Sequence, residues 1–275
     1  MKVLVLSGGG AKGAFQAGVV KALTEKGHRW DAIAGVSVGS INGSFLAQFR
    51  KEDQAEAADK LVEFWNQMKG DGDVFKRWFP FGKLHSLWTG GFYNTSPLLE
   101  RLKKDLDPNK LANSGVRLLI GAVCLESGEY RYVEGTHPNI HEWVMASSAF
   151  PVAFPPVLLD GKHWVDGGVR DTTPISDTLQ LNPESVDVVL CGALDSPGTF
   201  PAKDSTNVLK GGMRSAELLS DEVFNGDMLQ VPEAKRSLLT VYAPPKDAVL
   251  SDPLSFDPKS IANMLALGLQ VGRNG

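Results

Sequence analysis

The chain has 275 residues, of which 43% are hydrophobic and 22% charged, and its formal net charge is −4. This composition is typical of a globular protein that is long enough to bury a sizeable core. A weakly acidic chain without a long basic run argues against nucleic acid as the main partner.

The first fifty residues alternate between strand and helix patterns. Residues 2–6 are an apolar run that ends at a glycine cluster, and residues 13–26 have the small and apolar residues of a closely packed helix. A second apolar strand is predicted at residues 32–36 and a second helix at residues 38–50. This order indicates an α/β protein in which helices cover a parallel sheet.

The middle of the chain is less regular. Residues 52–68 are predicted to form an amphipathic helix, and residues 97–105 a shorter one. Between them, residues 75–93 are rich in aromatic side chains and are interrupted by glycine and proline, which argues against regular structure. The stretch could be an acyl-binding wall or a membrane-facing lid, or its aromatic residues could fill the core beneath a long loop.

A β-hairpin is predicted next, from strands at residues 117–124 and 129–133 that are joined by a glycine-containing turn. A helix is expected around residues 139–148. Further predicted elements are strands at 163–165, 186–191 and 237–242, and helices at 206–229 and 258–270. Since no linker or repeat separates these elements, residues 1–275 are expected to form one domain, with a lid or substrate-binding insertion at about 70–95.

Targeting and metal-binding signals are weak. The apolar run after Met1 is too short for a signal peptide, and no stretch approaches the ~20 apolar residues that span a bilayer. We therefore expect a cytoplasmic protein without a transmembrane segment that contacts membranes only peripherally. Cys124 and Cys191 lie in apolar runs without a second ligand nearby, so they are expected to be buried thiols, and no metal or cofactor is expected.

Ser37 lies in the pentapeptide Gly35-Val36-Ser37-Val38-Gly39, a Gly-x-Ser-x-Gly pattern between a predicted strand and a predicted helix. In this setting a sharp turn projects the serine hydroxyl clear of the sheet, and the helix N-terminus favours a developing negative charge. The pattern predicts a nucleophile. The alternative is an ordinary strand-to-helix turn in which the serine only caps the helix.

The glycine cluster that follows the first strand reads Gly8-Gly9-Gly10-Ala11-Lys12-Gly13. Successive glycine amides can form a concavity for an anion, and beside an activated serine they would form an oxyanion hole. The loops after the first two strands of such a fold lie close together, which supports this interpretation. The lysine could steady the loop or attract an anionic head group, or could simply be solvated.

The same cluster also fits a dinucleotide-binding fingerprint, because Gly8, Gly10 and Gly13 satisfy Gly-x-Gly-x-x-Gly. That fingerprint requires an acidic residue at the end of the second strand to hold the ribose. Asp31 precedes the second strand, and the strand runs into Ser37 instead. An oxidoreductase is therefore the less favoured alternative.

A serine nucleophile needs a base, and histidine is the usual one. None of the five histidines has a local motif: His28, His85, His137, His141 and His163. The sequence Asp166-Gly167-Gly168, after a short apolar run, is more suggestive, although Asp-Gly turns are common.

The three glycine-containing motifs, in this order, resemble the patatin-like phospholipase family. The resemblance extends from residue 3 to about residue 175 and includes the segments 94–98 and 146–151. Residues 169–174 lack an asparagine that often follows Asp-Gly-Gly in the family, and the last hundred residues match it only loosely. A non-catalytic lipid-binding protein and an esterase with a histidine triad remain alternatives.

The resemblance implies a three-layer α/β/α sandwich with a mostly parallel central sheet. It also implies a metal-independent serine hydrolase that cleaves acyl esters of lipids, as a phospholipase A or lysophospholipase does, through an acyl-enzyme. Ser37 would be the nucleophile and Asp166 its base, and the amides of Gly9 and Gly10, with help from Gly8, would hold the oxyanion. Other acyl substrates, such as thioesters, would use the same residues, and the pattern does not specify head group, chain length or oligomeric state.

Overall fold

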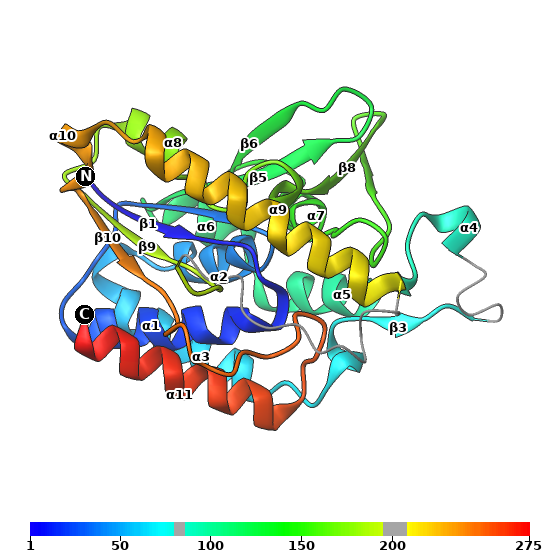
Figure 1. Cartoon of the computed structure of the whole chain (residues 1–275), viewed down its shortest axis with the longest axis horizontal. Coiled ribbons are helices and arrows are strands. Elements are labelled where there is room, and N and C mark those ends of the chain that lie inside the picture. Colours follow the sequence, from blue (N-terminus) through cyan, green and yellow to red (C-terminus); the bar gives the residue numbers. More distant parts are fainter. Residues whose placement is uncertain (80–85, 195–207) are drawn as a thin grey trace.

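The computed structural model describes residues 1–79, 86–194 and 208–275. Its central feature is an eight-stranded sheet in the order β10-β9-β1-β2-β5-β8-β7, with β6 paired to β5 (Figure 1). The strands of this sheet are β1 (Lys2–Leu6), β2 (Ala32–Val36), β5 (Arg117–Cys124), β6 (Tyr130–Glu134), β7 (Val157–Leu159), β8 (Lys162–Asp166), β9 (Ser185–Val189) and β10 (Leu239–Tyr242).

Helices lie on both faces of the sheet, because its central strands present apolar side chains to both sides. In β1, Leu4 and Leu6 belong to one core cluster, whereas Val3 and Val5 belong to the other. This continuous apolar pattern is typical of a parallel strand between two layers of helices. The α-helices are α1 (Gly13–Glu25), α2 (Val38–Ala47), α3 (Gln54–Asn66), α4 (Ser86–Thr89), α5 (Ser96–Asp105), α6 (Pro108–Asn113), α7 (Ile140–Ser147), α8 (Ile175–Thr178), α9 (Val208–Gln230), α10 (Glu233–Arg236) and α11 (Pro258–Asn274).

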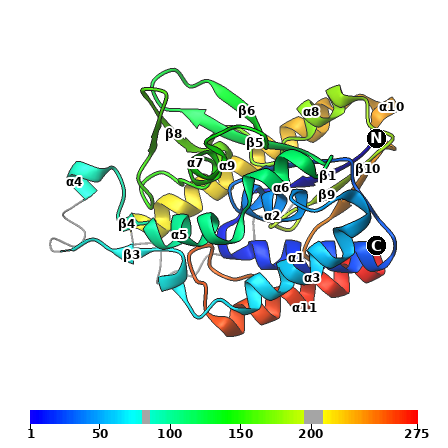
Figure 2. The same ribbon diagram turned by 180° about the vertical axis from the view of Figure 1, so that it is seen from behind.

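The two helical layers differ in size. One core cluster packs α1, α2, α3, α7 and α11 against the sheet, and the other packs α8 and α9 against the opposite face. Figure 2 shows α1, α3 and α11 together on one side of the strands. The α/β fold with a mostly parallel sheet, expected from the sequence, is therefore confirmed.

The ends of β2 and β8 meet inside the sheet, and this meeting positions the catalytic candidates. β2 pairs in parallel with the first part of β5, ending with Val36 opposite Gly121. β8 pairs antiparallel with the last part of β5, on the same edge, with Asp166 opposite Ala122. Since β6 occupies the other edge of β5, β2 and β8 run head-on toward each other. The next residue after β2 is Ser37.

Most of the elements expected from the sequence are present, with bounds that differ by a few residues. The short elements α6, α8, α10 and β7 were not anticipated. Nor were α4 and the two-residue strands β3 (Lys76–Arg77) and β4 (Tyr93–Asn94), which lie within the stretch expected to be irregular. The first two residues of the helix predicted at 206–229 lie outside the described residues. No helix in the described ranges is long and apolar enough to cross a membrane.

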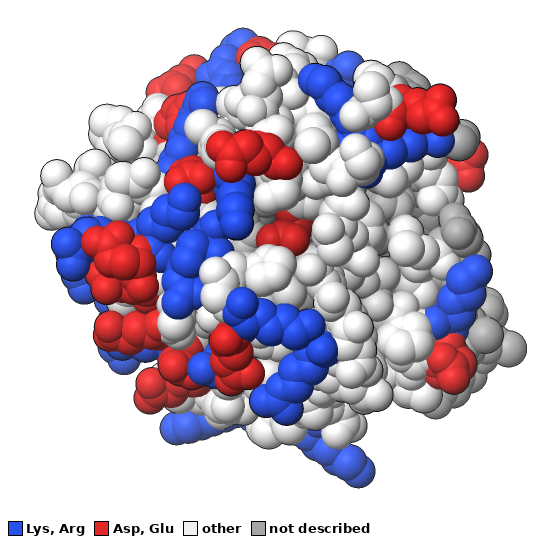
Figure 3. Space-filling model, turned by 90° about the vertical axis from the view of Figure 1, so that its left-hand side faces the viewer, with Lys and Arg blue, Asp and Glu red and all other residues white. Residues whose placement is uncertain are grey.

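The end of the molecule that carries both chain termini shows mixed charge. On the face in Figure 3, Lys and Arg side chains are interspersed with Asp and Glu, and no broad area has a single sign. A nucleic-acid interface requires a concentrated basic surface, and this face does not provide one.

Candidate active site

Ser37 occupies the sharp turn between β2 and α2. Its backbone lies at φ 55° and ψ −128°, which is a strained conformation for a residue with a side chain. The turn is tight because a Cβ atom on Gly35 would lie 2.3 Å from the Gly39 carbonyl oxygen, and one on Gly39 would lie 2.2 Å from the Leu6 carbonyl oxygen. Both glycines of the pentapeptide are thus required by the packing of the turn, as expected for a nucleophile elbow.

Two serines at the end of α7 hold the strained turn in place. The Ser37 amide donates to Ser147 Oγ at 3.0 Å, and Ser148 Oγ donates to the Ser37 carbonyl oxygen at 3.2 Å. The segment 146–151 was noted in the sequence only as part of the family resemblance. Its role was missed because the contact spans 110 residues of chain.

Asp166 lies at the end of β8. Its carboxylate accepts a hydrogen bond from the Gly168 amide at 2.8 Å, and the Ser37 side chain is near enough to lower its pKa. The residue is only 2% exposed. Burial raises the pKa of Asp166 to about 7, against the smaller opposing effects of the Ser37 side chain and the Gly168 amide. A carboxylate with this pKa, beside a serine, is suited to act as a general base near neutral pH.

The glycine loop passes directly beside Ser37. A Cβ atom on Gly8 would lie 3.3 Å from Ser37 Cβ. The Gly8 amide is already bonded to the Thr172 carbonyl oxygen at 3.0 Å, so it is not free to bind an oxyanion. The expectation that the Gly8 amide helps to bind the oxyanion is therefore corrected, because this amide anchors the loop instead. The amides of Gly9 and Gly10 have no acceptor among the described residues.

Both remaining glycines are fixed by close contacts. Gly9 has φ 156°, and a Cβ atom there would lie 2.3 Å from Cys191 Cβ. Gly10 has φ 58°, and a Cβ atom there would lie 2.2 Å from the Pro253 carbonyl oxygen, which also accepts from the Ala11 amide at 2.8 Å. The loop is therefore clamped between the end of β9 and a segment near the C-terminus.

A buried polar network supports the loop from below. Gln16 Nε2 donates to the Ser7 carbonyl oxygen at 2.8 Å, and Asn42 Nδ2 donates to Gln16 Oε1 at 3.0 Å. Trp65 Nε1 completes the network by donating to Asn42 Oδ1 at 3.0 Å. Buried polar groups that are fully bonded fix their surroundings firmly. Sequence reasoning missed these residues because each lies in a helix pattern that looks merely apolar or neutral.

The segment after Asp166 connects this residue to the glycine loop. Thr172, which accepts from Gly8, also donates through Oγ1 to the Gly168 carbonyl oxygen at 3.3 Å. The Asp171 carboxylate accepts from the Thr173 amide at 2.9 Å and from the Tyr132 hydroxyl at 3.4 Å, and so shapes the turn around Thr172. Gly167 is also required here, since its Cβ would lie 2.6 Å from the Gly121 carbonyl oxygen.

The four described histidines have partners away from Ser37, and His85 lies outside the described residues. His28 pairs with Asp187 at 2.9 Å, and His163 pairs with Glu126 at 2.7 Å. His141 Nε2 lies 2.9 Å from the Leu106 carbonyl oxygen, and His137 accepts from the Asn139 amide at 3.1 Å. Among the described residues, Asp166 is therefore the candidate base for Ser37.

Other reactive groups near the loop are poorly suited to chemistry. Burial raises the pKa of the Cys191 thiol to about 12, so it stays protonated at neutral pH. Lys12 and Gly13 lead the loop into α1, and the lysine charge acts on Cys191. Within the described ranges, no group of three or more His, Cys, Asp or Glu side chains could hold a metal ion.

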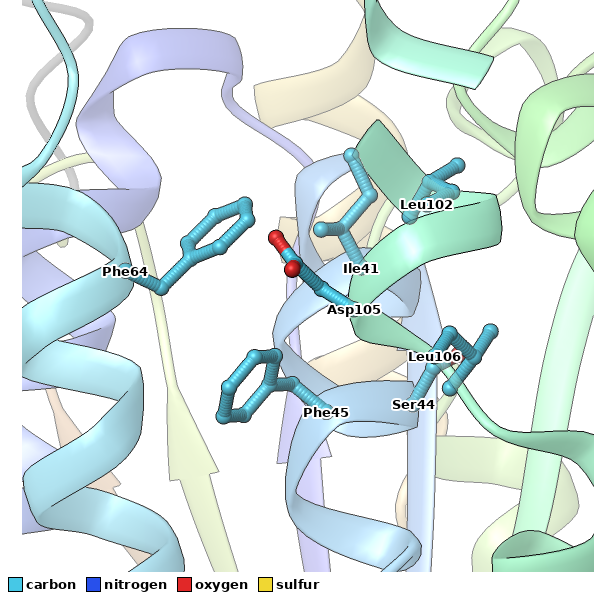
Figure 4. A pocket seen from close by; sticks show the side chains of 7 residues that line it. All are labelled: Ile41, Ser44, Phe45, Phe64, Leu102, Asp105 and Leu106. Atoms are coloured by element: carbon cyan, nitrogen blue, oxygen red, sulfur yellow. The ribbon is translucent and has the colours of Figure 1, made fainter. Parts of the chain in front are cut away.

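A small cavity lies one turn along α2 from the nucleophile (Figure 4). Its lining consists of Ile41, Ser44 and Phe45 from α2, Phe64 from α3, and Leu102, Asp105 and Leu106 around the end of α5. The cavity volume of about 10 Å³ leaves room for about one water molecule, so an acyl chain does not fit.

The comparison with known families decides the identity of this arrangement. The model of the patatin-like phospholipase family matches residues 4–179, which include the glycine loop, the elbow and Asp166. The chain belongs to the patatin-like phospholipase family. The match of the glycine loop to the dinucleotide fingerprint is therefore a coincidence of spacing. In agreement with this, Asp31 lies before β2 and forms an ion pair with Lys51.

Individual relatives of this patatin-like chain are distant. It is 27% identical over 207 residues to the lysophospholipase NTE1 of Kluyveromyces lactis, covering 74% of this chain and 13% of that protein. A patatin-like phospholipase domain-containing protein of Caenorhabditis elegans is 26% identical over 207 residues, covering 74% of this chain and 14% of the relative. The chain thus spans only a small part of these relatives.

Among solved structures, VipD from Legionella pneumophila is similar over 99% of this chain and 66% of its own, with 16% identity and a TM-score of 0.48.

Proposed function

We propose that this protein hydrolyses acyl esters of lipids, as a phospholipase A or lysophospholipase does, through a Ser37–Asp166 dyad. The observation that carries the proposal is the buried Asp166 carboxylate, which β8 brings beside Ser37 at the meeting point of β2 and β8. Membership of the patatin-like phospholipase family supports lipid acyl esters as the substrate class.

In the first half of the reaction, Ser37 Oγ attacks the acyl carbon while Asp166 accepts the hydroxyl proton. The negative charge that develops on the carbonyl oxygen is stabilised by the amides of Gly9 and Gly10. When the tetrahedral intermediate collapses, the bond to the leaving alcohol breaks and Asp166 returns the proton to that alcohol. The acyl group remains on Ser37.

In the second half, water attacks the acyl-enzyme and gives its proton to Asp166. Collapse of the second tetrahedral intermediate releases the fatty acid, and the proton returns to Ser37. The same carboxylate therefore serves as base and as acid in each half, which requires a pKa near the working pH.

We also propose that residues 1–275 act as one hydrolase domain. The C-terminal part supports the glycine loop through Pro253, and α11 packs closely on α1, where a Cβ atom on Gly268 would lie 2.1 Å from the Phe15 carbonyl oxygen.

The direct test is hydrolysis of a lysophospholipid and of a short p-nitrophenyl ester in the presence of EDTA. The parent is expected to cleave both, whereas Ser37→Ala and Asp166→Asn should lose about a thousandfold or more in kcat while remaining folded by circular dichroism. Cleavage of the short ester but not the lipid would favour a different acyl substrate. Full activity in Asp166→Asn would refute the dyad.

A further inference from the structure

A hairpin projects from the body of the molecule near the active site. We call its described residues, 76–79 and 86–94, the aromatic arm. Its strands pair antiparallel, with Lys76 opposite Asn94 and Arg77 opposite Tyr93. Trp78 Nε1 donates to the Gly91 carbonyl oxygen at 3.0 Å. In Figures 1 and 2 the arm extends from the end of the molecule opposite the two termini.

The structure divides the aromatic residues of this region into two groups. Phe75, at the base of the arm, is buried and packs against Tyr93, with ring centroids 4.6 Å apart, and against Phe154 and Phe256. Phe79 and Trp88, farther out, are 90% and 76% exposed. The aromatic residues at the base of the arm therefore fill the core. Phe79 and Trp88 do not, and large exposed aromatic side chains of this kind indicate a binding surface.

The charge of the region is unusual for this chain. Between Asp73 and Glu100 the sequence contains no acidic residue, although the whole chain has 32. The exposed Lys76 and Arg77 lie beside Phe79, and Lys83 falls outside the described residues. The opposite end of the molecule, by contrast, has interspersed charges (Figure 3).

The arm is joined to the segment that holds the catalytic residues. The Phe92 and Tyr93 amides donate to the Val152 and Ala153 carbonyl oxygens at 2.9 and 3.0 Å. Three residues earlier, the Ala149 carbonyl oxygen accepts from the Asp166 amide at 3.1 Å. The base of the arm and the end of β8 that carries Asp166 are therefore bonded to the same short segment.

We propose that the aromatic arm binds the surface of an anionic lipid bilayer. Trp and Phe side chains partition into the interfacial region, and nearby Lys and Arg side chains are attracted to anionic head groups. The test described below also shows whether the arm binds a protein instead. That the bilayer supplies the ester substrate rests on the proposed function. Binding of the arm to the bilayer does not require catalysis.

The experiment measures binding of the full chain carrying Ser37→Ala to vesicles of phosphatidylcholine, with and without about one third phosphatidylglycerol. Binding is expected to be stronger to the anionic vesicles. Phe79→Ser with Trp88→Ser, and separately Lys76→Glu with Arg77→Glu, should each weaken it by about tenfold or more. Phe79→Leu with Trp88→Phe should restore most of the binding, since the side chains stay apolar.

The matched control for charge is Lys2→Glu with Lys26→Glu, which makes the same change at exposed positions near the opposite end of the sheet. This control should bind the anionic vesicles much more tightly than the arm variant does. In a Ser37 background, all arm variants should cleave the short soluble ester like the parent, which separates a failure of docking from a failure of the proposed function.

Three results would overturn the proposal. They are no preference of the parent for anionic vesicles, binding that survives both arm double variants, and a dimer in solution that only the arm variants dissociate. The last result would identify a second copy of the chain as the partner of the arm.

Discussion

At the residue scale, the buried carboxylate of Asp166 is the proposed proton acceptor. The Ser37 side chain and the Gly168 amide lower its pKa, yet burial raises the pKa to about 7, which means that ionisation is costly in the folded protein. The unfolded chain has no such cost, because the pKa of an aspartate there is near its ordinary value of 3.8. As pH rises between these two values, the folded state loses stability relative to the unfolded state.

Replacing Asp166 with asparagine should therefore stabilise the protein, and more so at high pH. Between about pH 5 and pH 8 the additional gain should be on the order of 2–3 kcal/mol, or ~5 °C in Tm. Thermal melts of the parent and Asp166→Asn at both pH values measure the difference. A Tm difference that is the same at both pH values would mean that Asp166 is not a buried group with a raised pKa.

Ser37 and Asp166 could be predicted as candidates from the sequence because each lies in a short glycine-rich motif whose geometry is local. The sequence could not identify Ser147, Thr172 or Asn42, because their contacts are made across long stretches of chain. The sequence also predicted that the Gly8 amide helps to bind the oxyanion. Only the fold shows that this amide is bonded to the Thr172 carbonyl oxygen.

At the element scale, longer segments such as β1, α1 and β5 were predictable. A strand buried on both faces, or a helix buried along one stripe, has a clear pattern of apolar residues in the sequence. Short elements such as β7 and α6 leave too few residues for a pattern. The direction of β8 was also not predictable. Its antiparallel pairing with β5, which brings Asp166 to the end of β2, depends on the whole connection from β6 to β8.

The turn at Asp171 should position the glycine loop through Thr172. We expect Asp171→Ala to lower kcat about tenfold to a hundredfold on the short ester with little change in KM, because the Gly8 anchor is loosened while substrate binding is kept. Asp171→Asn, whose amide oxygen can still accept from Thr173, should recover most of the activity.

Asp107→Ala is the matched control, since it also removes a carboxylate that accepts from backbone amides, at the start of α6. It should cost a similar amount of stability and leave kcat unchanged. Equal kcat in Asp171→Ala and in the parent would show that the turn does not position the site.

At the scale of the whole molecule, the part of the chain beyond the family match contributes to the site. The family model ends at residue 179, yet Pro253 fixes the loop at Gly10 and Ala11. The helix α11 that follows packs against α1 through Gly18 and Gly268, each of which would clash with the backbone of the other helix if it carried a Cβ atom. The region that matches the family only loosely therefore packs against both the glycine loop and α1.

Gly268→Ala should destabilise the protein, because its Cβ would lie 2.1 Å from the Phe15 carbonyl oxygen and force α11 away from α1. We expect a loss of about 2 kcal/mol, or ~5 °C in Tm. Gly226→Ala in α9 is the control, since nothing lies within 4 Å of its Cβ and alanine favours the helix. Equal Tm values for the two variants would contradict close packing of α11 on α1.

The most direct test of the dyad is the rate at which a fluorophosphonate labels Ser37, followed by mass spectrometry across pH. The rate should rise with pH through about 7, where Asp166 ionises, and should fall about a hundredfold or more in Asp166→Asn without the pH dependence. Labelling of Ser37 in Asp166→Asn at the parent rate, with the same dependence on pH, would show that another group is the base.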